Sequence, residues 1–325
     1  MDNKRVTLAD IAKEVGVSIN TVSHALNDKK DISEEMKKRI NEVASKMGYI
    51  RNSFASYMRS GKSKCISVIV GDISNPHFSI IVKEIEMTAK KYDYSTFVIN
   101  TNENEKAERD AIITSISKNV DGIIICPVQK STNNIKLLIS NNIPFTLIGR
   151  HFKDLDTNYV VSDDRNSGYI ACEHLLKKGH KKIAVLNGPL YISSALERLD
   201  GIKAAFKKSG MELSNDDVYT LSVTSGNHQE QINKIIDKKY SAVICFNDLI
   251  ALEFTSMLGN NTIDIISFDN IRSKFIMPLN FTSISSSKTK MSHKAFEILM
   301  KNIENRDLPN QHIVLDTKIA PINSR

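Results

Sequence analysis

The residues with the clearest binding chemistry lie together on the short stretch Ser18–Asn27. At about 100° per residue, the apolar side chains of Val22, Ala25 and Leu26 fall on one side of a helix. The other side carries groups that can donate and accept hydrogen bonds and are mostly uncharged. Its members are Ile19, Asn20, Ser23, His24 and Asn27. This stretch therefore predicts a helix that packs on neighbours with one face and binds something external with the other.

The elements that must position this helix are short and local. Thr7–Val15 predicts an amphipathic helix, and Gly16-Val17 supplies a turn before Ser18, a favourable N-cap. Helix, glycine turn and second helix are the plan of a helix-turn-helix, whose second helix enters the DNA major groove. Two short helices joined by glycine also occur in proteins that do not bind DNA, so geometry alone leaves both interpretations open.

A third helix and the local charge extend the pattern. Ser33 is expected to cap a helix that runs to about Met47 and ends at Gly48, with an apolar stripe that closes a small core. Residues 1–64 hold 13 Lys and Arg against 8 Asp and Glu, whereas the remainder holds 31 against 29. Such a basic surplus favours binding to a phosphate backbone, although it is also typical of a solvated surface.

Three sequence motifs of the N-terminal region resemble those of a known family. Val6–Ala12, Gly16–Ser18 and Thr21–Asn27 together resemble the N-terminal signature of the LacI/GalR family of bacterial transcription regulators. Many members have Arg at the position of His24, whereas members similar to purine repressors have His. The resemblance implies a regulator of double-stranded operator DNA, most simply a repressor, that is a homodimer or, alternatively, a tetramer, and in which each head reads one operator half-site.

The candidate DNA contacts divide into two sets. We expect Ile19, Asn20 and His24 to contact base edges, and a second set to hold phosphates, which position the protein without specifying sequence. The expected phosphate contacts are Thr7, Ser18, Thr21, Ser23, Asn27 and Ser33. By resemblance, Tyr49 also reaches a phosphate; its alternative is to cover the edge of the small core.

Residues 51–64 resemble the hinge helix and linker of the family, a segment that orders on operator DNA and pairs with its twin in a dimer. Asn52, near its start, is a further candidate DNA contact. Met58 stands where the family has a leucine wedge, and could insert at a minor-groove step. Alternatively, Phe54 and Met58 pack on the following domain. Many members have Pro where this chain has Arg51.

From Cys65 the pattern alternates between strand and helix in two successive cycles, which predicts parallel sheets covered by helices. The predicted fold class is a small all-α helix-turn-helix domain followed by a two-lobed α/β core of the periplasmic-binding-protein-like type I. The predicted strands of the core are 66–70, 96–99, 122–126, 145–148, 183–186, 242–246, 265–268 and, as the last strand, 312–319. The predicted helices are 78–92, 105–117, 132–140, 165–178, 195–209, 227–238 and 291–303. The expected domains are 1–50, 51–64 and 65–325, with an N-lobe of about 65–161 plus 286–318 and a C-lobe of about 162–285 plus 319–325.

The resemblance continues through the core, where several sequence motifs of the family occur in the same order as in its members. They are Asp121–Ile124, Gly179–Ala184, Glu197–Gly201, Phe246–Asp248 and Ser267–Asp269. Because ligands of parallel α/β sheets sit outside the carboxyl ends of the strands, polar residues at these ends are candidates for effector contacts, although strand ends are polar in any such protein. The resemblance and these positions give Asn75, Phe78 as an apolar wall, Arg150, Asp163, Ser194, Arg198, Asn247 and Asp269.

The identity of the effector stays open. Many sugar-binding relatives place an aromatic residue where this chain has Leu221–Ser225, and the chain contains no tryptophan. A sugar or sugar derivative is the expected effector. The alternatives are control by a corepressor or a phosphoprotein, or an activator role.

Other function classes are disfavoured. The sequence has no GxGxxG, GxxxxGK[ST] or HExxH motif, so no enzyme is predicted. Its four cysteines form no CxxC pair, so neither a zinc site nor a disulfide framework is expected, and no cofactor is predicted. No run of 18 apolar residues and no signal-peptide core are found, which favours a cytoplasmic protein, nucleoid-associated when bound to DNA, over a transport-type sugar-binding protein.

Overall fold

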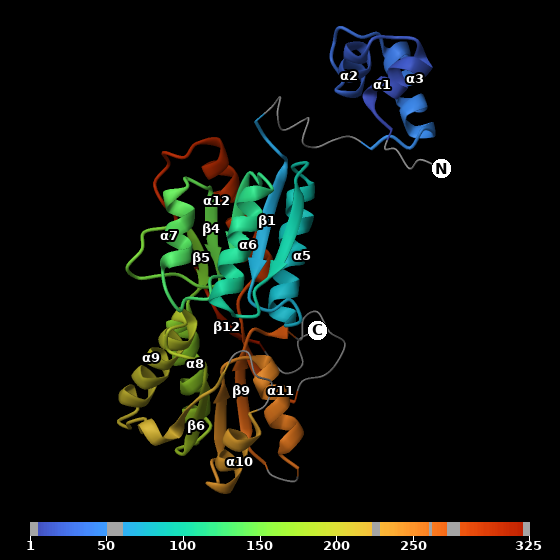
Figure 1. Cartoon of the computed structure of the whole chain (residues 1–325). Helices are drawn as coiled ribbons and strands as arrows, with labels where there is room; N and C mark the ends of the chain where they lie inside the picture. Colours follow the sequence, from blue (N-terminus) through green and yellow to red (C-terminus); the bar gives the residue numbers. More distant parts are fainter. Residues whose placement is uncertain (1–5, 51–60, 223–227, 260–261, 272–279, 321–325) are drawn as a thin grey trace. The chain divides into compact units, whose positions relative to one another are not determined.

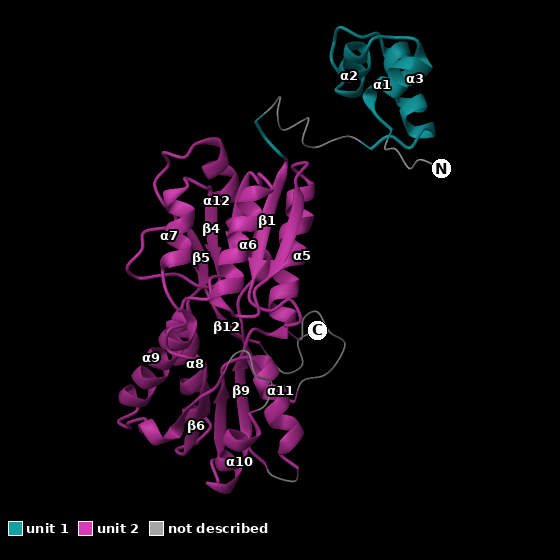
Figure 2. Cartoon of the chain, viewed as in Figure 1, with its two compact units in different colours: residues 1–63 teal, residues 64–325 magenta. Residues whose placement is uncertain are grey.

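The computed structural model describes residues 6–50, 61–222, 228–259, 262–271 and 280–320. The chain divides into two compact units, residues 1–63 and 64–325, which we call the head and the core (Figure 2). None of the helices in the described ranges is long and apolar enough to cross a membrane.

The head consists of three helices around a small apolar cluster. They are α1 (Leu8–Val15), α2 (Ile19–Leu26) and α3 (Glu34–Lys46). Ile11, Val22 and Ile40, one from each helix, are fully buried at its centre. Gly16 ends α1 with φ of +78°, a left-handed conformation that glycine adopts without steric cost, so the chain can turn sharply into α2.

The N-lobe of the core is a six-stranded sheet in which every pair is parallel, in the order β11-β5-β4-β3-β1-β2. Its strands are β1 (Cys65–Val70), β2 (Ser95–Asn100), β3 (Gly122–Ile125), β4 (Phe145–Ile148), β5 (Tyr159–Ser162) and β11 (His312–Leu315). The helices of this lobe are α5 (Pro76–Lys90), α6 (Glu105–Ser117), α7 (Asn133–Ser140) and α12 (Lys288–Glu304). Figure 1 shows these helices around the sheet.

The C-lobe repeats this plan with the strand order β12-β10-β9-β8-β6-β7, parallel except for the antiparallel pair of β10 and β12. Its strands are β6 (Ile183–Asn187), β7 (Val218–Thr220), β8 (Ala242–Cys245), β9 (Asp264–Phe268), β10 (Thr282–Ser285) and β12 (Lys318–Ala320). Its helices are α8 (Asp164–Lys177), α9 (Ser193–Lys208), α10 (Gln229–Asp237), α11 (Asp248–Met257) and the short 3-10 helix Asn215–Asp217.

The chain passes between the lobes three times, at Asp163, at 286–287 and at 316–317. The last passage corrects the prediction of one strand over 312–319. That stretch forms two strands, because β11 pairs with β5 in one sheet and β12 pairs with β10 in the other. The predicted set of elements also omitted β5, β7, β10 and α11.

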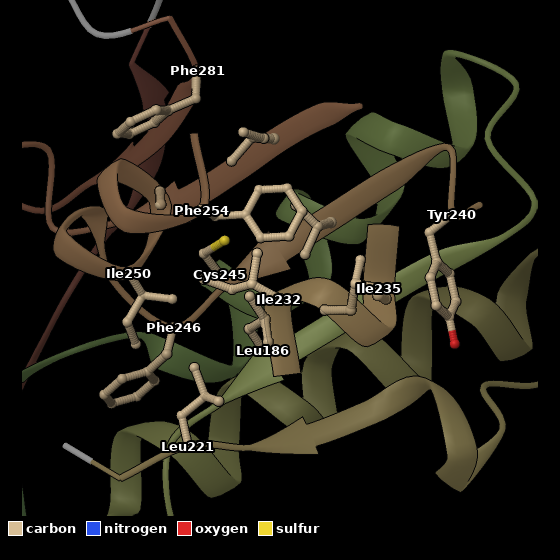
Figure 3. Close-up of a cluster of buried hydrophobic side chains, with 14 of the residues drawn as sticks. Leu186, Leu221, Ile232, Ile235, Tyr240, Cys245, Phe246, Ile250, Phe254 and Phe281 are labelled. Carbon is tan, nitrogen blue, oxygen red and sulfur yellow. The ribbon is translucent and has the colours of Figure 1, made fainter. Parts of the chain in front are cut away.

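An apolar cluster on one face of the C-lobe sheet fixes the walls of the region where the lobes meet. Phe254 and Phe281 are almost completely buried in it (Figure 3). Phe246 and Ile250 belong to the same cluster, and both also line the cavity described below. The cavity wall is therefore continuous with the packed interior of the lobe.

Candidate DNA-binding and effector sites

The outward face of α2 is available for binding. Ile19 is 51% exposed although it is apolar, and Asn20, His24 and Asn27 are exposed beside it. Thr21 and Ser23 are half-buried at the edges of this face. The remaining helix residues Val22, Ala25 and Leu26 are buried. The helix thus has one face committed to the head's interior and one face without a packing partner among the described residues.

Three predicted phosphate contacts are helix N-caps. The hydroxyls of Thr7, Ser18 and Ser33 accept hydrogen bonds from the backbone N–H groups of Asp10 (3.3 Å), Thr21 (3.1 Å) and Met36 (3.3 Å) respectively. The Thr7 hydroxyl also donates to the Asp10 carboxylate at 2.7 Å. These caps lie at positive helix ends, which favour phosphate oxygens.

His24 and Tyr49 have neighbours within the head. The His24 Nδ1 lies 2.6 Å from the Asp31 carboxylate, and this hydrogen bond lowers the pKa of Asp31. The imidazole keeps its second nitrogen for an external group. Tyr49 is half-buried against the apolar cluster of the head. Arg51, Asn52, Phe54 and Met58, with the predicted hinge helix, lie outside the described residues.

The core contains a cavity of about 240 Å³ where the two lobes meet. Its lining includes seven of the eight predicted effector contacts: Asn75, Phe78, Arg150, Ser194, Arg198, Asn247 and Asp269. Asp163 is not part of this lining. Its carboxylate caps α8 by accepting from the backbone N–H of Asn166 at 2.9 Å, and the next residue, Asp164, lines the cavity instead.

Arg198 is held by the close packing of α8 on α9. A Cβ at Gly168 would lie 2.0 Å from the Arg198 carbonyl oxygen, and a Cβ at Gly201 would lie 1.9 Å from that of Arg165, so only glycine permits this approach. The Arg198 Nε donates to Asp164 at 2.7 Å, and Nη1 donates to the Phe246 carbonyl at 2.6 Å. Burial raises the pKa of Asp164, and the Arg198 charge opposes that shift.

Two asparagines bring amide groups to the cavity from helix N-termini. The side-chain oxygen of Asn75 accepts from the His77 backbone N–H, and that of Asn247 accepts from Ile250, both at 2.9 Å. Each amide oxygen is therefore occupied by the cap, and each NH₂ group can donate to a ligand. Ser194, in the first turn of α9, is 7% exposed and adds a hydroxyl.

Asp269 supplies a carboxylate from a left-handed turn, with φ of +92°. Its Oδ1 lies 3.3 Å from the His77 Nδ1, which forms no hydrogen bond with any described residue. Burial lowers the pKa of His77 to about 4, so this imidazole is neutral near pH 7. A neutral ring beside a carboxylate leaves the Asp269 charge available to a ligand.

Among the cavity residues that the sequence predictions missed are six acidic or histidine side chains: Asp72, His77, Glu103, Asp164, His228 and Glu253. Asp164 adjoins the predicted Asp163, but the sequence does not show which of the two carboxylates caps the helix and which faces the cavity. Glu103 and Glu253 belong to no recognisable sequence motif. Their roles depend on partners that are distant in the sequence, Arg150 for Glu103 and His228 for Glu253. Among the described residues, no group of three or more side chains could hold a metal ion.

Comparisons with known proteins cover both units. The sequence profile described as "Bacterial regulatory proteins, lacI family" matches residues 7–52, and that described as "Periplasmic binding proteins and sugar binding domain of LacI family" matches residues 63–315. The chain is similar to a repressor of Glaesserella parasuis named HTH-type transcriptional repressor PurR. The two are 28% identical over 306 residues, which cover 92% of this chain and 90% of that protein.

A repressor of the same name from Mannheimia succiniciproducens is 24% identical over 323 residues, covering 97% of each chain. Among solved structures, the Lac repressor dimer bound to operator and the anti-inducer ONPF matches with a TM-score of 0.82 at 21% identity. That match covers 97% of this chain and 98% of the repressor chain. The match shows that the two chains share a fold.

Proposed function

The chain belongs to the lacI family of bacterial regulatory proteins, and from this premise we propose how it recognises DNA and its effector. It is a DNA-binding transcriptional repressor controlled by a small-molecule effector, and it is not an enzyme. The observation that carries the proposal is the exposed face of α2. It places Ile19, Asn20 and His24 outward on a helix whose opposite face is fully packed.

In this proposal α2 lies in the major groove, where Asn20 and His24 hydrogen-bond base edges and Ile19 makes apolar contact. The capped N-termini of α1, α2 and α3 hold backbone phosphates through Thr7, Ser18 and Ser33, with Thr21, Ser23, Asn27 and Tyr49 beside them. Residues 51–60, including Asn52 and Met58, join the head to the core in sequence and act as the hinge that contacts the minor groove. Bound in this way, the protein is associated with the nucleoid.

The proposed repressor acts as a homodimer formed through the N-lobe. The edge strand β2 exposes Phe97 and Val98, each at 39%, and the adjacent α5 exposes Met87 at 48%. Large apolar side chains gathered on one edge and the neighbouring helix support an interface with a second copy. Two copies present two heads, which suits an operator with two half-sites.

The effector binds in the cavity of the core, contacted by Asn75, Ser194, Arg198, Asn247 and Asp269. Since these residues come from both lobes, a ligand stabilises one arrangement of the lobes over others, and this difference in affinity is what couples the cavity to DNA. Asp163 acts on the cavity only through the start of α8, which it caps.

The first experiment is selection of duplexes from a randomised DNA library by the full-length protein, followed by fluorescence-anisotropy titration of the selected duplex. Titrations with and without sugars, sugar phosphates and purines identify the effector. Binding loosened by one compound establishes an inducer, and binding tightened by one establishes a corepressor. Failure to enrich any sequence, with or without the compounds, rejects the proposal.

A further inference from the structure

The cavity contains Arg150, whose positive charge is already paired with the carboxylate of Glu103. The Arg150 Nη1 and Nη2 donate to the two carboxylate oxygens of Glu103, each at 2.8 Å, and Nη1 also donates to the Pro127 carbonyl at 2.9 Å. Arg150 is 6% exposed and Glu103 is 5% exposed, so water screens the pair poorly. A two-point pair of this kind is the strongest form of contact between these groups.

The backbone is distorted to place Glu103 there. Asn102 and Glu103 have φ of +50° and +53°, a left-handed conformation that costs energy for residues other than glycine. The carboxylate packs directly over Gly71, where a Cβ would lie 2.2 Å from the Glu103 Oε1. The strained backbone at Asn102 and Glu103 and the absence of a side chain at Gly71 both allow the Glu103 carboxylate to reach Arg150. The local structure therefore favours this ion pair.

The second cavity arginine is also paired with a carboxylate, because the Arg198 Nε donates to Asp164 at 2.7 Å. Among the described lining residues, Arg150 and Arg198 are the only arginine or lysine side chains. The acidic lining residues are Asp72, Glu103, Asp164, Glu253 and Asp269. Negative charge therefore exceeds positive charge even after the Glu253 carboxylate is matched with His228, 2.7 Å away.

This balance discriminates between ligand classes. A phosphate group entering the cavity would compete with carboxylates for both guanidinium groups and lose its hydration without gaining a free cation. Hydroxyl groups meet no such penalty. They can donate to Asp72 and Asp269, and accept from the free NH₂ groups of Asn75 and Asn247.

We propose that Glu103, by occupying Arg150, makes the cavity selective for uncharged, hydroxyl-bearing effectors and excludes their phosphate esters. Glu103 acts as a specificity-determining residue, because it decides whether the Arg150 guanidinium can bind a ligand. The proposal rests on the effector role assigned to this cavity under the proposed function.

The test uses the full-length protein and matched pairs of compounds, measured by titration calorimetry. The pairs are glucose and glucose 6-phosphate, ribose and ribose 5-phosphate, fructose and fructose 6-phosphate, and adenosine and AMP. In the pair that binds, we expect the uncharged member to bind on the order of 100-fold more tightly, since it avoids burying an unpaired charge. Glu103→Gln, which frees Arg150, should reduce this preference by about tenfold or more.

Three further samples isolate the cause. Inorganic phosphate, compared with chloride at equal ionic strength, should raise the melting temperature of Glu103→Gln and leave that of the wild type unchanged. The double variant Glu103→Gln/Arg150→Met has no free guanidinium, so it should regain the wild-type preference and lose the response to phosphate. Glu105→Gln, outside the cavity lining, is the matched control and should behave as the wild type.

If Glu103→Gln does not fold, the wild-type panel and Asp269→Asn, which removes a different cavity carboxylate, still decide the matter; Asp269→Asn should weaken the preference several-fold. A phosphate ester that binds the wild type better than its uncharged partner overturns the proposal while the effector role stands. Unchanged preference in both Glu103→Gln and Asp269→Asn also overturns it. If no compound of either class binds, the effector role of the cavity fails first.

Discussion

The head and the core present their candidate contacts in opposite ways. On α2 the side chains of Ile19, Asn20 and Asn27 are exposed, and few of their polar atoms are used within the protein. In the core cavity Arg150, Glu103 and Asp164 are buried and Arg198 is nearly so, and each arginine is hydrogen-bonded to its carboxylate partner. The head can therefore meet a large, charged duplex by surface complementarity, whereas the cavity selects a small ligand by the few donors and acceptors left free.

A substitution of Arg198 should have the largest effect, because the core cavity depends on the ion pair of Arg198 with the buried Asp164. Arg198→Met leaves Asp164 buried without its partner, so the core should lose roughly 3–5 kcal/mol of unfolding free energy and bind no effector. Chemical denaturation followed by circular dichroism measures the loss. Arg109→Met, which removes an exposed arginine of α6, is the control. Equal stabilities of the two variants would contradict the role assigned to the pair.

The described part of the head depends instead on a small apolar cluster. Ile40→Ala removes a fully buried side chain, so the head should lose roughly 2–4 kcal/mol of stability. We expect calorimetry to show an earlier transition for the head, with DNA binding lost and effector binding retained. Ile50→Ala, at a residue of the head that is 69% exposed, is the matched control. Loss of effector binding in Ile40→Ala would mean that the units are not independent.

A change on the outward face of α2 should act on recognition alone. Asn20→Ala removes a donor and acceptor for base edges, so affinity for the selected duplex should fall by roughly 1–3 kcal/mol. Affinity for random duplex and its dependence on salt should stay unchanged, because phosphate contacts remain. Asn41→Ala, an exposed residue of α3, should alter neither. An equal loss on random duplex would assign Asn20 to the phosphates.

The smallest effect concerns pH, and its sign differs between the units. Burial, followed by the charge of Asp164, raises the pKa of Glu197 from 4.5 to about 7. Between these values the folded core keeps a proton that the unfolded chain releases, so stability should fall by about 1 kcal/mol or more as pH rises through this window. Asp248, with a pKa raised to about 6, contributes in the same direction.

Glu197→Gln should flatten that dependence, measured as melting temperature between pH 5 and pH 7 against Glu230→Gln, a control at an exposed residue. In the head, the exposed Asp31 has a lowered pKa, so its small contribution is lost as pH falls instead. Identical pH profiles for Glu197→Gln and the wild type would show that Glu197 is not buried in solution.

The sequence predicted elements with strong periodicity and clear ends. The helix at Glu105–Ser117 and the strand at Phe145–Ile148 were predicted with the bounds that the structure shows. The helix α11 was missed because its polar residues Asp248, Glu253, Thr255 and Ser256 are interspersed with leucines around the helix and form no clear polar stripe. The strands β5, β7 and β10 were missed because at least half of their residues are Ser, Thr or Tyr, so they lack the apolar run by which the equally short β3 and β4 were predicted.

The cavity was predicted in outline because strand ends meet at one edge of a parallel sheet, which brought Asn75, Asn247 and Asp269 into one lining. Its electrostatics could not be predicted in this way. Glu103 and Arg150 are 47 residues apart, and Asp164 and Arg198 are 34 apart, so their pairing follows only from tertiary packing. Asp163 was chosen over Asp164 because a sequence does not show which of two adjacent carboxylates caps the helix.

The division of residues 312–320 between two sheets has a consequence for how the core is made. The edge strand β11 completes the N-lobe sheet, and β12 completes the C-lobe sheet, yet both are synthesised after nearly all the other strands. Neither lobe can therefore reach its final sheet while residues 312–320 are still inside the ribosome. The three helices of the head are close in sequence, so the head can fold as soon as it leaves the ribosome. The core can complete its two sheets only after residues 312–320 have also emerged. During that interval the edges of β5 and β10, which β11 and β12 later cover, are unpaired, and unpaired strand edges can pair with other chains.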